Sequence, residues 1–147
     1  MTTYTGADPS TIIDHLGLSV TDCGLSRSFY DAALAPLGIS RVIDVELDDG
    51  HQACGYGREG QPPRFWVSSV GVSRGQAHIA FQAASQDEVR AFHRAALAAG
   101  GRDHGAPALR PTHHPDYFAA FVYDPDGYNI EAVTHVPHDE GTPVIGT

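Results

Sequence analysis

Positively charged residues are scarce in this chain. Among its 147 residues, 9 are Lys or Arg and 18 are Asp or Glu, so the formal net charge at pH 7 is −9. Such a charge repels phosphate backbones and anionic lipid headgroups, although a local cation can override the overall field. We therefore expect neither nucleic acid nor a membrane as a partner.

Cysteine is also rare, and from the first residues we expect no export signal. The two cysteines, Cys23 and Cys54, are too few for a disulfide framework. The opening MTTYTGADPS contains no basic segment followed by an apolar one. We expect a reducing, cytoplasmic setting in which both cysteines are small, semi-buried fillers rather than reactive groups.

The chain contains an internal repeat with an offset of 63 positions. The stretch DHLGLSVTDCGLSRSFYDAALAPLG, which starts at Asp14, aligns without a gap with AHIAFQAASQDEVRAFHRAALAAGG, which starts at Ala77. His15 then coincides with His78, and Gly38 with Gly101. A repeat of this kind predicts two copies of one supersecondary unit, related by a pseudo-twofold rotation.

Each copy begins with a strand and continues with a helix. Apolar residues alternate with small or polar ones up to Val20, which is the period of a strand with one apolar face. Leu25, Phe29, Ala33 and Leu37 then recur at helical spacing, which predicts the core-facing side of the first helix. Ser85 and Glu88 form a capping box that marks the start of the second helix.

Short extended runs broken by turns follow the helix in both copies. The predicted fold class is therefore α+β, with two strand-helix-three-strand modules at residues 12–70 and 76–136 in one structural domain. We expect the polar ends, residues 1–11 and 137–147, to be mobile.

Three residues form a possible metal-ligand set. Strand alternation turns His15 and His78 away from the helix-packing faces, and the repeat places them at equivalent points. Glu131 lies between apolar neighbours in the last strand, where a buried carboxylate is costly unless it faces a cation or hydrogen-bond donors. Two imidazoles and one carboxylate can hold a divalent transition metal that also binds substrate. Alternatively, the histidines are satisfied by the backbone and Glu131 is a solvated edge charge.

Three motifs resemble those of the vicinal oxygen chelate superfamily: DHLGLSV, AHIAF and AFVYDPDGYNIEAV. This superfamily includes glyoxalase I, bleomycin-resistance proteins, fosfomycin-modifying enzymes and type I extradiol dioxygenases. The resemblance covers roughly residues 12 to 135 and implies paired βαβββ modules, whose curled mixed sheets surround a cup-shaped metal site. It carries a metal role to His15, His78 and Glu131, and implies Fe, Mn, Ni, Co or Zn as the divalent metal.

The chain departs from the patterns of particular members. A glyoxalase-like site has a fourth protein ligand, usually Glu, at the end of the first module, where the repeat places Ser68. Extradiol dioxygenases place a histidine and a tyrosine ahead of the final Glu. Here the segment RPTHHPDYFAAFVY offers His113 or His114 for the histidine, but has Phe121 in place of the tyrosine.

The candidate catalytic residues follow from this segment. Either His113 or His114 can shuttle protons near neutral pH, or both are solvated loop residues. Tyr123 is the candidate for the missing tyrosine, with Tyr117 as the alternative. A candidate substrate pocket shares faces with the ligands and consists of Trp66, Ser68, Gln82, Phe121 and Asn129.

Two classes of function remain. The first is a metal-dependent enzyme, a lyase or isomerase or an extradiol-type dioxygenase, that chelates vicinal oxygens of a catechol, a hydroxyketone or an enediol precursor. The second is a non-catalytic, bleomycin-resistance-like dimer that sequesters a drug or other small molecule, for which the net charge of −9 suits a cationic ligand. The two histidines and Glu131 favour the enzyme, because sequestration needs none of them. A homodimer is expected in both cases, because open curled sheets leave edges that a twofold partner can cover.

Overall fold

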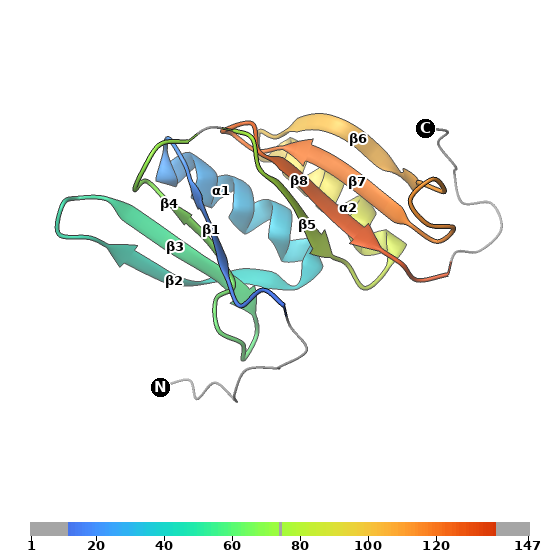
Figure 1. Cartoon of the computed structure of the whole chain (residues 1–147), viewed down its shortest axis with the longest axis horizontal. Coiled ribbons are helices and arrows are strands. Elements are labelled where there is room, and N and C mark those ends of the chain that lie inside the picture. Colours follow the sequence, from blue (N-terminus) through green and yellow to red (C-terminus); the bar gives the residue numbers. More distant parts are fainter. Residues whose placement is uncertain (1–11, 74, 138–147) are drawn as a thin grey trace.

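The computed structural model describes residues 12–73 and 75–137, so nearly all of the predicted mobile ends lies outside the described residues. The first module contains β1 (Leu16–Ser19), α1 (Cys23–Leu34), the 3-10 helix η1 (Ala35–Leu37), β2 (Ile39–Glu46), β3 (Gln52–Arg58) and β4 (Phe65–Ser68). The second contains β5 (His78–Gln82), α2 (Gln86–Ala98), β6 (Arg102–Leu109), β7 (Phe118–Tyr123) and β8 (Asn129–Thr134). The predicted α+β class with paired βαβββ modules is confirmed (Figure 1).

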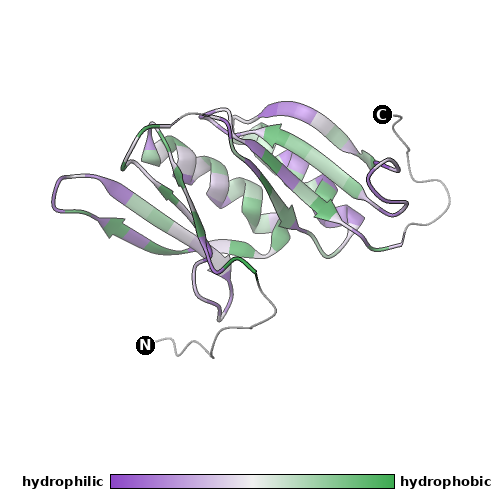
Figure 2. Cartoon of the chain, viewed as in Figure 1, coloured by the Kyte–Doolittle hydropathy of each residue, from purple (hydrophilic) through white to green (hydrophobic). Residues whose placement is uncertain are grey.

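The two sheets have the same strand order. It is β1-β4-β3-β2 in the first sheet and β5-β8-β7-β6 in the second, with β1-β4 and β5-β8 parallel and the other pairs antiparallel. Among the described strands, β1 and β5 each have an unpaired edge, and the two sheets do not join into a closed barrel. The outermost strand β6 is hydrophilic over its first half, whereas β7 is hydrophobic almost throughout (Figure 2).

One hydrophobic core extends through both modules. Phe29 and Tyr30 of α1 and Phe92 of α2 are fully buried in it. Phe65 of β4 meets Phe81 of β5 edge to face, with 5.1 Å between ring centroids, so the core continues across the junction of the modules.

The buried face of α1 differs from the prediction. Leu25 was expected in the core but is 61% exposed, whereas Ser26 and Tyr30 are buried. The α-helix also ends at Leu34, and the last turn becomes a 3-10 helix because Pro36 cannot donate to an α-helical hydrogen bond. The predicted cap of α2 is confirmed at Ser85, which accepts a hydrogen bond from the Glu88 amide, whereas the Glu88 carboxylate accepts one from the Ala84 amide instead of that of Ser85. Asp22 caps α1 by accepting a hydrogen bond from the Leu25 amide.

Polar contacts of the β7-β8 turn hold the modules together. Asp126 Oδ1 accepts hydrogen bonds from the amide and the hydroxyl of Thr21, at 2.9 and 2.7 Å. The Tyr30 hydroxyl donates to Asp124 Oδ2 at 2.5 Å. Burial raises the pKa of the Asp124 carboxyl, while the hydrogen bond from Tyr30 opposes that shift.

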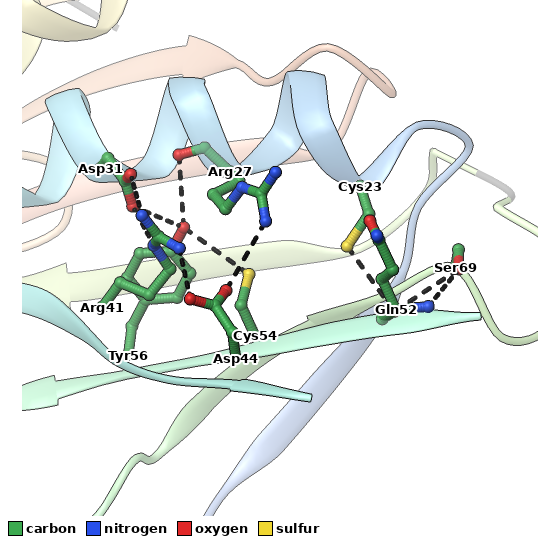
Figure 3. A network of polar contacts seen from close by, with 9 residues as sticks. All are labelled: Cys23, Arg27, Asp31, Arg41, Asp44, Gln52, Cys54, Tyr56 and Ser69. Carbon is green, nitrogen blue, oxygen red and sulfur yellow. Dashed lines mark hydrogen bonds and ion pairs between the residues drawn. The ribbon is translucent and has the colours of Figure 1, made fainter. Parts of the chain in front are cut away.

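A polar network ties the β2-β3 hairpin to α1 (Figure 3). The Arg41 guanidinium contacts both Asp31 of α1 and Asp44 of β2. Cys23 and Cys54 lie beside this network, both are buried, and burial raises the pKa of the Cys54 thiol to about 11. Because thiols are nucleophilic only when deprotonated, both cysteines fit the filler role expected from the sequence.

Candidate functional site

The outer face of the second sheet collects most of the predicted site residues. Strand register places His78, Asn129 and Tyr123 in one cross-strand row, and Ala80, Glu131 and Phe121 in the next. Ile79 and Phe81 alternate with these residues and pack against the core, as the sequence pattern predicts. Gln82 lies in a third row on the same outer face.

His78 and Glu131 face each other directly. His78 Nε2 lies 3.3 Å from Glu131 Oε1, and the carboxylate is 2% exposed whereas the imidazole is 49% exposed. His78 Nδ1 lies 3.0 Å from the Asn129 carbonyl oxygen, which can only accept a hydrogen bond. Nδ1 therefore carries a proton, and in the neutral ring Nε2 directs its lone pair toward Glu131.

Tyr117 contacts the other oxygen of this carboxylate. Its hydroxyl donates a hydrogen bond to Glu131 Oε2. Burial, followed by the hydrogen bond and the negative charge of Glu131, raises the pKa of Tyr117, so the phenol stays protonated and remains a donor. The loop before β7 fixes this position, because the Arg110 amide donates to the Tyr117 carbonyl at 2.7 Å.

His113 and His114 lie on the same loop around Tyr117. The His113 ring centroid is 5.0 Å from that of Tyr117, and His114 packs against His135 at 5.7 Å. Both loop histidines are exposed. His113 is therefore linked to Glu131 through Tyr117, whereas His114 faces the start of the C-terminal segment.

Tyr123 lies one row away from Glu131. Its hydroxyl is 3.1 Å from His104 Nε2, and the two rings stack at 4.2 Å. Tyr117, the alternative to Tyr123, is thus the tyrosine whose hydroxyl contacts the predicted ligand.

His15 occupies the corresponding place in the first module. It precedes β1, its side chain is 62% exposed, and its Nδ1 lies 2.7 Å from Asp14 Oδ2. It lines a cavity of about 560 Å³ together with Gly17, Pro62, Pro63 and Trp66. Within the described part of the chain, no three His, Cys, Asp or Glu side chains gather to hold a metal, so one chain does not bring His15 to His78 and Glu131.

The remaining candidates on the first sheet lie with His15. Trp66 pairs with Gly17 and Gly55, and Ser68 pairs with Ser19 and Ala53. The Ser68 hydroxyl accepts a hydrogen bond from the Val70 amide at 3.0 Å. The predicted pocket is therefore divided between two faces: Trp66 and Ser68 on the first sheet, and Gln82, Phe121 and Asn129 on the second.

Arg110 is a site residue that the sequence interpretation did not include. Its guanidinium carbon lies 5.2 Å from the centroid of the Phe121 ring, and that ring stacks with His78 at 6.1 Å. Its Nη2 donates to the Ala106 carbonyl at 2.7 Å. A signal was present in the sequence, because Arg110 is one of few cations in an acidic chain and directly precedes the segment with His113 and His114.

A family model and a solved structure both relate the chain to the same superfamily. A family model for the Glyoxalase/Bleomycin resistance protein/Dioxygenase superfamily matches residues 12–132. A glyoxalase/bleomycin resistance protein from Albidiferax ferrireducens T118 is 27% identical with a TM-score of 0.68, covering 84% of this chain and 98% of that one. A search of curated proteins finds no match.

Two more distant structures share the fold. A glyoxylase/bleomycin resistance protein/dioxygenase domain from Frankia sp. EAN1pec has 16% identity and a TM-score of 0.62, covering 84% of this chain and 96% of that one. Glyoxalase I from Zea mays has 20% identity and a TM-score of 0.63, covering 83% of this chain. The match covers 45% of the maize enzyme, so this chain spans about half of its length. No helix of the described residues is long and apolar enough to cross a membrane.

Proposed function

Because the chain belongs to the Glyoxalase/Bleomycin resistance protein/Dioxygenase superfamily, we propose that it is a metal-dependent enzyme whose divalent transition metal binds His15, His78 and Glu131. The metal would chelate two neighbouring oxygens of a small organic substrate. The observation that carries this proposal is the buried Glu131 carboxylate facing His78 Nε2 at 3.3 Å.

The donor set fits such a metal. A carboxylate oxygen and an imidazole lone pair that face each other repel unless a proton or a cation lies between them. The Asn129 carbonyl accepts a hydrogen bond from His78 Nδ1. Such a bond keeps the proton on Nδ1 and leaves Nε2 free to bind a metal. When bound, a divalent ion supplies positive charge that stabilises negative charge growing on the substrate oxygens.

The third ligand would come from a second copy of the chain. His15 directly precedes β1 and His78 begins β5, and each of these strands has an unpaired edge, as β2 and β6 also do. A twofold partner that brings the β1 edge of one copy beside the β5 edge of the other would place His15 next to the other copy's His78 and Glu131. The proposed homodimer would contain two such sites.

Residues of the loop before β7 would support the reaction. Tyr117 donates a hydrogen bond from its hydroxyl to Glu131 Oε2 and thereby orients the carboxylate. His113, packed on Tyr117 and open to solvent, would accept or deliver protons at the edge of the site. With Fe(II), three protein ligands make oxygen insertion feasible, whereas Zn, Ni, Mn or Co would favour isomerisation or addition.

A non-catalytic role is the second candidate. The net charge of −9 suits sequestration of a cationic small molecule, which needs no metal. The two candidates differ in metal content, so metal analysis separates them.

The test is elemental analysis of protein purified without a chelator. We expect about one transition metal per chain in the wild type, and loss of most of it in His15→Ala, His78→Ala and Glu131→Gln variants. His93→Ala is the matched control, because His93 pairs with Asp103 at 2.9 Å, away from the site. A triple variant that retained stoichiometric metal would place the centre elsewhere, and a metal-free wild type that binds a cationic drug tightly would favour sequestration.

A further inference from the structure

Arg110 has no carboxylate partner among the described residues, which is also true of Arg58, Arg94 and Arg102. Among the described residues no ion pair includes Arg110, whereas ion pairs with carboxylates are formed by Arg27, Arg41, Arg64 and Arg90. Its buried Nε also has no hydrogen-bond partner among the described residues. A buried donor without a partner is unfavourable, so this guanidinium can still take an acceptor.

The local backbone leaves room for Arg110 over the Phe121 ring. A Cβ on Gly105 would lie 2.9 Å from Phe121 Cδ2 and 3.1 Å from Arg110 Nη2, so a larger residue at this position would displace the ring or the guanidinium. Register shifts on both sides of Gly105 mark a local irregularity in β6. The strand therefore deviates where Arg110 and Phe121 meet.

Arg110 also shares a neighbour, Phe121, with the proposed metal ligand His78. Its guanidinium carbon is 5.2 Å from the Phe121 ring centroid, and the His78 ring centroid is 6.1 Å from the same point. Arg110 and the proposed ligand His78 are therefore both neighbours of the Phe121 ring. In a chain with a net charge of −9, an anionic substrate needs a local cation of this kind.

We infer that the substrate carries a carboxylate in addition to its chelating oxygens, and that the Arg110 guanidinium binds this carboxylate beside the Phe121 ring. A guanidinium suits this role because its planar donors match both oxygens of a carboxylate. The inference rests on the proposed metal-chelating function and names the substrate class for that site.

The test compares two probes on Zn²⁺-loaded protein: catechol, and 3,4-dihydroxybenzoate, which adds one carboxylate to the same chelating pair. Zn²⁺ is redox-inert, so binding is measured by calorimetry without turnover. Wild-type protein is expected to bind the carboxylate-bearing probe at least about tenfold more tightly than catechol. In Arg110→Gln this preference should fall to about one while catechol affinity stays unchanged, and Arg110→Lys should retain part of the preference.

The controls distinguish a failure of the Arg110 inference from a failure of the proposed metal chelation. Arg94→Gln, which changes an exposed arginine on α2, should keep the full preference. Equal binding of both probes by the wild type would overturn the role of Arg110 and leave metal chelation standing. Equal weakening of both probes in Arg110→Gln would mean that Arg110 only supports the fold. Binding of neither probe would overturn the chelating function together with this inference.

Discussion

At the scale of single residues, the site depends on which hydrogen-bond partner each polar atom has. The Asn129 carbonyl fixes the tautomer of His78, and Tyr117 fixes one oxygen of Glu131. Strand alternation in the sequence predicted that His78 and Glu131 share a face. It could not predict the Tyr117 contact, because that contact depends on how the loop from Arg110 to Tyr117 closes.

The Tyr117 hydroxyl should therefore tune metal binding. We expect Tyr117→Phe to lower metal affinity by about tenfold or more, because the Glu131 carboxylate loses the donor that orients it. Titration of Zn²⁺ against a competing chelator measures this change. Tyr123→Phe is the matched control, since that hydroxyl meets His104 instead. Equal losses in both variants would argue against a specific role for Tyr117.

At the scale of elements, periodicity predicted the helices and their caps but not the full buried face of α1. Leu25 fits the helical pattern, yet it lies at the start of α1, where little of the molecule covers it. Tyr30 is buried because the β7-β8 turn of the other module supplies Asp124 as a partner for its hydroxyl. That partner is 94 positions away in the sequence, so local periodicity carries no information about it.

The free energy of unfolding should therefore depend more on the Tyr30 hydroxyl than on the Leu25 side chain. Tyr30→Phe leaves the buried Asp124 Oδ2 without its donor and should lower the free energy of unfolding by about 1–3 kcal/mol. Leu25→Ala should change it by less than about 0.5 kcal/mol, because the leucine is exposed. Urea unfolding measures both values. A larger loss for Leu25→Ala than for Tyr30→Phe would contradict the described packing of α1.

At the scale of the whole molecule, the repeat predicted two modules with equivalent histidines. The pseudo-twofold relation was taken to place His15 and His78 around one ion, but it fixes only their equivalence and not the distance between them. The described residues of one chain do not gather His15 with His78 and Glu131. The unpaired β1 and β5 edges supply the physical reason to look for the missing ligand in a second copy.

The central claim is a metal site completed between two copies, and mixing two inactive variants tests it most directly. Homodimers of His15→Ala and of Glu131→Gln should each lack a complete site. A heterodimer would join His15 of one copy to His78 and Glu131 of the other and regain one site. After an equal mixture exchanges subunits at random, elemental analysis should find about a quarter of the wild-type metal per chain. Mixed dimers that stay as metal-poor as the separate variants, while the wild type is loaded, would contradict a site shared between copies.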